Sequence, residues 1–337
     1  MAAATYAARL NAFKVNPEDY WPGKNGKVTT LDLIDRAATV AGLGAVDLNY
    51  PDHLEGIAPG EMTGRLAARG LAVNGFAMRY YTEPAFKLGA FTNPDPAVRR
   101  AAIDLTKRGI DTMVACGGDL MTLWLGQDGF DYSFQADYAA LWELEIAGIR
   151  EVAEHNPTID ISLEYKPNEP RAFALLPDVG TTLLAAAAVG RPNLGITLDF
   201  AHVLYADEMP AYAAALVARH SRLLGVHLND GYGKRDDGLM AGSVHLVQTI
   251  ELLHALTAMN YTRAIYFDTF PDIAGLDPVR ECAANIESVE AMWAVVGRLS
   301  TDTPAGARLR GAIARQDAIT SQRIVQAALF GRLPAHE

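Results

Sequence analysis

Several side chains that can bind a metal ion or move a proton follow short apolar runs in the second half of the chain. In chain order they are Glu164 and Lys166 in IDISLEYKP (159–167), Asp199 in LGITLDF (194–200), His202 three residues later, His227 in LLGVHLND (223–230), Asp236 and Asp237 in the loop that follows, and Asp268 in AIYFDTF (264–270). Carboxylates and imidazoles bind divalent cations, and a lysine stabilises negative charge that develops during a reaction. These residue types are typical of metal-assisted chemistry.

An ordinary structural role accounts for any one of these residues taken alone. A single acid after a strand is usually a helix cap, and Lys166 could simply pair with Glu169 or Asp199. Four successive strands that deliver such groups to one place are different, because the groups would repel one another without a cation. The sequence therefore predicts a divalent metal, Mn²⁺ or Mg²⁺, with Co²⁺ as a further candidate and Zn²⁺ less favoured.

Short β-rich runs alternate with longer segments of helical periodicity along the chain. Besides the four runs above, the predicted strands are RLNAFKV (9–15), GAVDLNY (44–50), LAVNGFAMRY (71–80) and DTMVACGG (111–118). Eight strands that alternate with about eight helices predict an α/β fold, the (β/α)8 TIM barrel. An open doubly wound sheet is the alternative, but no glycine-rich phosphate turn follows the first strand.

A TIM barrel builds its site at the carboxyl ends of the strands, which is where the predicted metal-binding side chains fall. Residues 1–299 are predicted to form this catalytic barrel. Residues 300–337 are predicted to form a helical tail that packs on the barrel or acts as an oligomer arm, so we expect a homo-oligomer, a dimer or a tetramer.

Composition argues against several classes of protein. The net charge of −11 disfavours nucleic acid as a partner, because an acidic surface repels phosphates. No apolar run approaches the ~20 residues of a membrane span, and the amino terminus has no basic signal-peptide region. Two cysteines cannot form a disulfide framework. We therefore expect a cytoplasmic protein without a membrane partner.

Several separated motifs resemble those of the metal-dependent xylose isomerases, within the wider group of sugar isomerase and epimerase barrels. The motifs are TEPAFKLGAFTNPDPAVRRAAI (82–103), VACGG, KPNEPR after Glu164, LLPDVGTTL (175–183), HLND with DDGLMAG downstream, and YFDTFP. They occur in the family's order, and the resemblance spans residues 8–297. It implies a small sugar as substrate.

The resemblance also implies two metal ions per subunit that share one carboxylate. The first site would use Glu164, Asp199, His227 and Asp268. The second would use Asp199, His202 and Asp236, with Asp237 or Gly238 at the position of a further aspartate. Lys166 would bind the oxygen at the carbonyl end of the substrate.

The sequence departs from the xylose isomerases at several pocket positions. Asn49 stands where they have the histidine that helps to open the sugar ring, although Asp52, which orients that histidine, is present. Cys116 replaces a pocket tryptophan, Phe270 replaces a lysine, and His227 replaces an aspartate, as in rhamnose isomerases and ketose 3-epimerases. These departures predict that the substrate is a sugar other than, or besides, xylose.

Three further residues are candidates for substrate contact. Tyr81 and Trp21 could form an aromatic wall against one face of the sugar, although ordinary packing explains each equally well. His53, beside Asp52, is an alternative source of the ring-opening imidazole.

The favoured function is an aldose–ketose isomerase, and several alternatives remain. A ketose 3-epimerase generally uses two glutamates, whereas this chain has the shorter Asp268 and retains His202 and Asp236. A lyase or dehydratase acting on a cyclitol or glycoside stays open, and a non-catalytic sugar-binding protein is least favoured. The related DNA-repair endonucleases need more histidines at the rim and a basic face, which this chain lacks.

Overall fold

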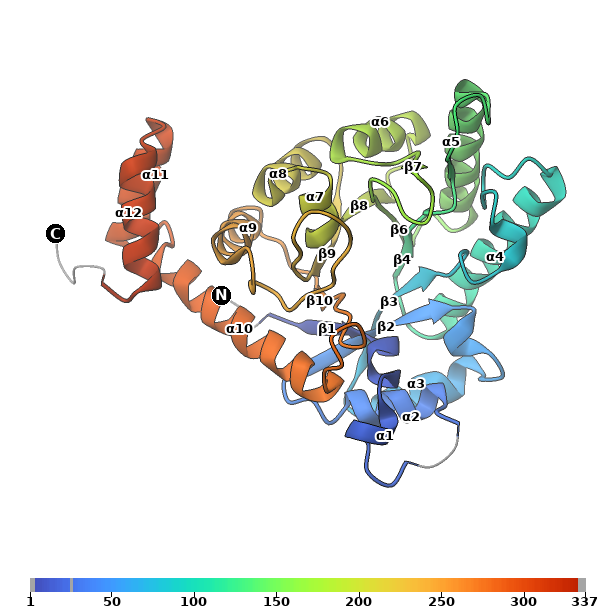
Figure 1. The fold of residues 1–337 in the computed structure, drawn as a ribbon, viewed down its shortest axis with the longest axis horizontal. Helices are drawn as coiled ribbons and strands as arrows, with labels where there is room; N and C mark the ends of the chain where they lie inside the picture. The colour runs from blue at the N-terminus through green and yellow to red at the C-terminus, as the bar shows by residue number, and fades with distance from the viewer. Residues whose placement is uncertain (1–3, 25–26, 333–337) are drawn as a thin grey trace.

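Eight parallel strands form a closed barrel in the order β1-β10-β9-β8-β6-β4-β3-β2 (Figure 1). The structure is a computed structural model that describes residues 4–24 and 27–332. The barrel strands are β1 (Tyr6–Arg9), β2 (Leu43–Tyr50), β3 (Ala72–Met78), β4 (Leu120–Leu123), β6 (Asp160–Glu164), β8 (Leu194–Asp199), β9 (Leu223–Leu228) and β10 (Ile265–Phe267). The predicted (β/α)8 TIM barrel is confirmed.

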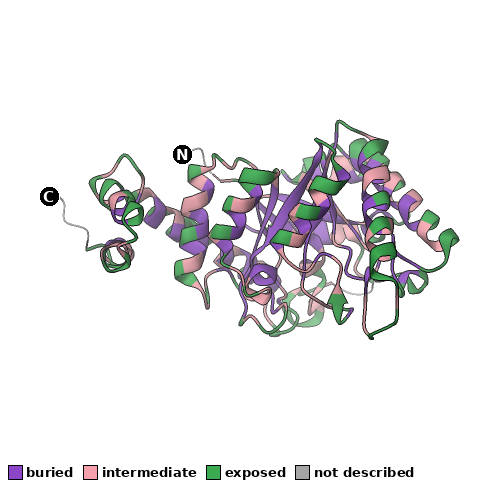
Figure 2. Cartoon of the chain, turned by 90° about the horizontal axis from the view of Figure 1, so that it is seen from above, coloured by how far each residue is buried: buried purple, intermediate pink, exposed green. Residues whose placement is uncertain are grey.

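Helices follow the strands and cover the outside of the barrel, while the strands lie buried inside (Figure 2). They are α1 (Pro17–Tyr20), α2 (Thr30–Ala37), α3 (Pro59–Ala68), α4 (Pro96–Ala115), α5 (Tyr138–His155), α6 (Val179–Val189), α7 (Phe200–Tyr205), α8 (Pro210–His220), α9 (Leu246–Ala258) and α10 (Pro278–Arg298), with short 3-10 turns η1 (Leu10–Lys14), η2 (Asp52–Leu54) and η3 (Pro84–Phe86). Every residue of β8 is buried, as expected for a strand covered on both faces.

Aspartates mark where several of the helices begin. The side chains of Asp95, Asp137, Asp178 and Asp277 accept hydrogen bonds from backbone N–H groups in the first turns of α4, α5, α6 and α10. Proline follows two of these caps, at the first helical position, where it costs no hydrogen bond. These caps fix the helix starts and so the lengths of the loops above the strands.

The first strand lies earlier than the sequence predicted. The prediction placed it at 9–15, but β1 ends at Arg9 and the following residues form the 3-10 turn η1. Leu10 and Phe13 are both fully buried and lie three residues apart, which is one turn of a 3-10 helix. Arg9 therefore stands at the carboxyl end of a strand rather than at its start.

The fourth strand was also wrongly placed. The predicted strand 111–118 contains the last turn of α4, whose Ile110 and Met113 are buried at helical spacing. Gly117, with φ of 80°, ends the helix in the left-handed region that glycine tolerates. The true strand β4 begins at Leu120, so Cys116 lies before the strand rather than within it.

Two short strands, β5 (Gly129–Phe130) and β7 (Phe173–Ala174), pair antiparallel and join the loops that follow β4 and β6. The rings of Phe130 and Phe173 stack with centroids 5.2 Å apart. This small sheet ties together two of the loops that surround the mouth of the barrel.

Two further helices, α11 (Pro304–Ala314) and α12 (Ala318–Leu329), lie beyond α10 and stand to one side of the barrel (Figure 1). Arg298 at the end of α10 donates a hydrogen bond from Nε to the carbonyl oxygen of Ala328 at 3.0 Å. Ile319 and Phe330 are largely exposed on this pair. Its role as an oligomer arm stays a prediction, and residues 333–337 of the predicted tail lie outside the described part. Within the described ranges, none of the helices combines the length and apolar character needed to cross a bilayer.

Candidate metal centre

Four neighbouring strands bring their charged ends to one point at the mouth of the barrel. Glu164 ends β6, Asp199 ends β8, His227 lies near the end of β9, and Asp268 follows β10 directly. One ligand atom from each of these four residues lies within 4.8 Å of the others. The first predicted ligand group is thus brought together by the strand register, since parallel neighbours end at the same level.

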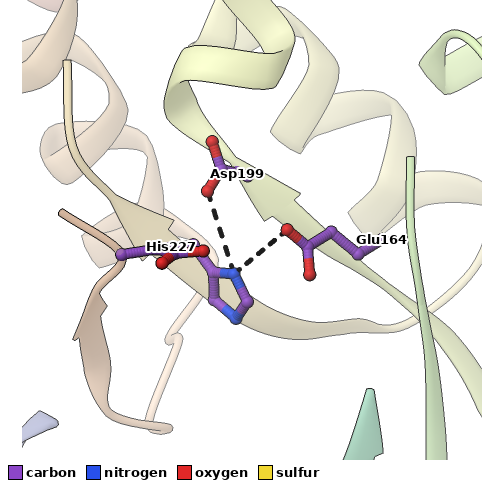
Figure 3. Close-up of side chains that lie close together, drawn as sticks. Glu164, Asp199 and His227 are labelled. Atoms are coloured by element: carbon purple, nitrogen blue, oxygen red, sulfur yellow. Dashed lines mark ion pairs between the residues drawn. The ribbon is translucent and has the colours of Figure 1, made fainter. Parts of the chain in front are cut away.

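Three side chains of this first group, those of Glu164, Asp199 and His227, point toward one another (Figure 3). Nδ1 of His227 lies 3.4 Å from Oε1 of Glu164 and 3.9 Å from Oδ2 of Asp199. Neither this nitrogen nor Oδ1 of Asp268 has a hydrogen-bond partner among the described residues, although both atoms are buried. Buried polar atoms without partners that converge on one point fit a cation.

A second group, Asp199, His202 and Asp236, shares Asp199 with the first. Nε2 of His202 lies 3.1 Å from Oδ2 of Asp236 and 4.0 Å from Oδ1 of Asp199. Nδ1 of His202 lies 3.0 Å from the carbonyl oxygen of Tyr165, to which it can only donate. This bond leaves Nε2 as the free ligand atom that faces the carboxylates.

The shared carboxylate is held by Asn229, which is fully buried. Its Nδ2 lies 3.1 Å from both carboxylate oxygens of Asp199 and 3.0 Å from the carbonyl oxygen of Asp268. Its Oδ1 accepts a hydrogen bond from the backbone N–H of Ala201 at 2.8 Å. Asn229 therefore orients one carboxylate that serves both groups, a role the sequence did not reveal.

The electrostatics of the cluster show why a cation fits it. Burial raises the pKa of Asp199 to about 7 and also raises the pKa of Asp268. Burial opposes charge on both imidazoles, yet Glu164 and Asp199 outweigh it and raise the pKa values of His227 to about 10 and His202 to about 9. The carboxylates thus draw positive charge to this point, and a bound cation can supply that charge in place of protons.

Lys166 reaches the edge of the second group. Its Nζ lies 3.1 Å from Oδ2 of Asp236 and 2.9 Å from Oε2 of Glu169, and 5.2 Å from the ring centre of Trp124. The expected pairing with Glu169 is therefore present. The ammonium group also lines the pocket, where it can contact a substrate.

A cavity of about 310 Å³ opens over both groups. Of the predicted substrate-contact residues, Asn49, Tyr81 and Phe270 line it. Trp124, which follows β4, lines it as well. The pocket therefore has a tryptophan, and the prediction that Cys116 takes the place of one was wrong because the fourth strand was misplaced.

Four predicted site residues belong neither to the pocket lining nor to the two ligand groups, which departs from their predicted placement. Cys116 caps the end of α4, with its thiol 4.0 Å from the carbonyl oxygen of Pro59. Trp21 packs against Arg36, whose guanidinium lies 4.8 Å from the ring centre. Asp52 is exposed in η2. Asp237 turns toward its own loop, where it accepts a hydrogen bond from the backbone N–H of Tyr232 at 2.8 Å.

The alternative ring-opening residue, His53, is buried behind Asn49. Its Nδ1 accepts a hydrogen bond from the backbone N–H of Asn49 at 3.0 Å. Burial lowers the pKa of His53 to about 3, so the ring stays neutral. Asn49 itself donates from Nδ2 to Oδ1 of Asn11 at 2.7 Å. His53 is absent from the described pocket lining, so it supports Asn49 rather than facing a substrate.

Residues 35–290 match the family model described as xylose isomerase-like TIM barrel, and the chain belongs to this family. It is 28% identical over 231 residues to the xylose isomerase of Thermus thermophilus. That match covers 67% of this chain and 57% of the relative, so it spans little more than half the length of that enzyme.

Solved structures share the fold at low sequence identity. A D-tagatose 3-epimerase-like protein superimposes with a TM-score of 0.68 at 15% identity, over 87% of this chain and 98% of that one. An L-ribulose 3-epimerase gives a TM-score of 0.67 at 17% identity, over 88% of this chain and 96% of that one. At these identities the similarity shows the barrel alone.

Proposed function

We propose that this protein is a metal-dependent isomerase that interconverts an aldose and its ketose, acting on a sugar other than, or besides, xylose. The observation that supports it is the pair of ligand groups that meet in one pocket and share Asp199. Glu164, Asp199, His227 and Asp268 would hold one divalent cation, and Asp199, His202 and Asp236 would hold a second. The oxygen-rich ligands favour Mn²⁺ or Mg²⁺.

The protein's own groups can assist this reaction in definite ways. A cation held here would polarise the sugar carbonyl as a Lewis acid. The Lys166 ammonium lies at the pocket edge, where it can donate a hydrogen bond to the substrate oxygen on which negative charge builds. The rings of Tyr81, Trp124 and Phe270 line the pocket and limit the access of water to the reacting carbons.

A ketose 3-epimerase is the second candidate. It would need carboxylates that remove a proton from C3 and return it, and Glu164 and Asp268 both belong to the first ligand group and line the pocket. Oδ1 of Asp268 has no hydrogen-bond partner among the described residues, so it is free to accept a proton. The named 3-epimerases share the fold, although that similarity does not define a reaction.

Proton NMR in D₂O separates the two candidates. The protein is loaded with Mn²⁺, incubated with a panel of aldoses and ketoses, and stripped of metal before spectra are recorded. An aldose–ketose pair formed without deuterium, or with deuterium only at C1 or C2, supports the isomerase and distinguishes direct transfer from an enediol route. Deuterium at C3 supports the epimerase. Sugar binding without any turnover contradicts both.

A further inference from the structure

Two arginines line the same pocket, and the proposed reaction gives neither of them a role. Arg9 ends β1, and Arg79 follows β3 directly. These two strands flank β2, so the arginines enter the mouth of the barrel from neighbouring positions. The metal-binding groups come instead from the strands β6 to β10.

Arg9 contacts an aromatic ring and forms one long ion pair. Its guanidinium carbon lies 4.7 Å from the ring centre of Phe270. Its Nε is 3.6 Å from Oδ1 of Asp268, which is too far for a hydrogen bond. Asp268 also belongs to the metal-binding group, so the one carboxylate that pairs with Arg9 among the described residues is shared with that group.

Arg79 also contacts an aromatic ring. Its guanidinium carbon lies 4.2 Å from the ring centre of Tyr81. Its Nε is buried and has no hydrogen-bond partner in the part of the chain that the structure describes, and no carboxylate there lies within ion-pair distance of this side chain. Stacking on a ring fixes the plane of a guanidinium while its N–H groups stay available.

With both metal sites filled, the remaining charges of the pocket would leave these two side chains uncompensated. Two divalent cations would balance the four ligand carboxylates, and Lys166 already pairs with Glu169. The remaining acid of the pocket lining, Asp47, is buried and hydrogen-bonded to Asn74. Two half-buried cations without an anion are costly, and an anion bound between them would remove that cost.

We infer that Arg9 and Arg79 bind an anionic group of the substrate, a carboxylate or a phosphate ester, so that the substrate is an acidic sugar rather than a neutral one. Planar guanidinium groups bind both anions through paired N–H donors. The cavity of about 310 Å³ suits a single sugar unit with one such group. This inference rests on the proposed function, since it names the substrate class of the same site.

Binding of compounds that cannot be isomerised tests the inference apart from turnover. Calorimetry on the Mn²⁺-loaded protein compares D-glucitol, D-gluconate and D-glucitol 6-phosphate, which share a six-carbon chain. We expect at least one anion to bind about tenfold or more tightly than D-glucitol, as one charge-assisted pair would give, and the tighter anion identifies the group. Equal affinity for all three compounds would contradict the inference.

Variants show whether the arginines cause the preference. Arg79→Gln and Arg9→Gln should each reduce the preference for the anion over D-glucitol to about threefold or less. Arg79→Lys should retain part of this preference because the charge stays. Arg219→Gln, an exposed arginine on α8, is the matched control and should leave it unchanged. If both glutamine variants keep the full preference, the anion binds the metal ions directly and the inference is wrong.

The outcomes also separate this inference from the proposed reaction. An arginine-dependent preference for anions, without turnover of any sugar acid or sugar phosphate, would support the binding site and contradict the isomerase. Isomerisation of neutral sugars, with no arginine-dependent preference, would support the isomerase and contradict the binding site.

Discussion

Strand β6 carries an acidic residue at each end, and the two acids have different surroundings. Asp160 begins the strand, and both of its carboxylate oxygens pair with arginines, Arg222 and Arg263. Glu164 ends the strand and faces Asp199 and His227 instead. One short strand thus joins an acid that pairs with two arginines to an acid that faces a carboxylate and an imidazole.

The same difference extends to the two ends of the barrel. At the amino end, Arg263 also pairs with Asp119, which precedes β4. At the carboxyl end, Oδ1 of Asp236 and Oδ1 of Asp268 are buried without hydrogen-bond partners among the described residues. Acids that are satisfied by arginines stabilise a fold modestly, whereas acids that converge without partners cost stability and indicate a ligand.

The largest effect should follow from Asp199→Asn, which removes the carboxylate shared by both groups. We expect loss of both metal ions and a fall in turnover of about a thousandfold or more, because even outer-shell partners of metal ligands are worth about 10–100-fold each. Metal analysis after gel filtration, together with steady-state kinetics, measures this.

The matched control for this change is His202→Ala. This substitution removes a ligand of the second group only, so one ion per chain should remain. Near-normal turnover in Asp199→Asn would contradict the shared-ligand assignment. Full activity in His202→Ala would contradict the need for a second ion.

Lys166→Met should have the next largest effect. Lys166 forms ion pairs with Asp236 and Glu169 and is also proposed to contact the substrate. We expect turnover to fall by about a hundredfold with metal content unchanged, as for the loss of one donor to a developing negative charge. Steady-state kinetics and metal analysis of the same sample check this. Loss of metal, with turnover restored by added Mn²⁺, would show that Lys166 only holds Asp236 in place.

Glu145 on α5 is a third kind of acid: it is buried and, among the described residues, has no arginine partner and belongs to no metal-binding group. Both of its carboxyl oxygens lack hydrogen-bond partners among the described residues, and burial, reinforced by Asp128, raises its pKa well above 4.5. The unfolded chain ionises this group above about pH 4.5 while the folded protein keeps its proton. Folding stability therefore falls as pH rises from 4.5 toward the raised native pKa.

Glu145→Gln removes this titration and keeps the shape of the side chain. We expect the variant to be more stable than the wild type at about pH 8, with a difference that shrinks toward about pH 4. Thermal unfolding across this pH range measures it. If the unfolding temperatures of the two proteins change with pH in parallel, Glu145 ionises in the folded state as it does in the unfolded chain.

The smallest effect should come from Asp160→Asn at the amino end of β6. Its arginine partners are partly exposed, so the loss should be about 1 kcal/mol or less of unfolding free energy. Metal content and turnover should not change, since Asp160 lies at the opposite end of the strand from Glu164. Denaturant unfolding and metal analysis test both points. Loss of metal would contradict the conclusion that the amino end of the barrel is structural and only the carboxyl end binds metal.

The metal groups could be predicted because two local patterns suffice for them. Apolar runs that end in Glu164, Asp199, His227 and Asp268 show where strands stop, and the barrel places those ends together. The pocket walls could not be predicted in this way. They depend on strand boundaries. Because two predicted boundaries were wrong by several residues, the sequence did not reveal that Arg9 lines the pocket, and it placed Cys116 there where the structure places Trp124.

Hydrophobic period and residue type were enough to predict the barrel and the chemistry of its mouth, because both are local properties of the chain. The packing of the whole chain set which neighbours each side chain meets. It turned Asp237 away from the centre, placed Asn229 against the shared Asp199, and stacked Arg9 and Arg79 on aromatic rings beside the metal groups. Such contacts join residues far apart in the chain, so they depend on how strands, helices and loops pack rather than on any local pattern.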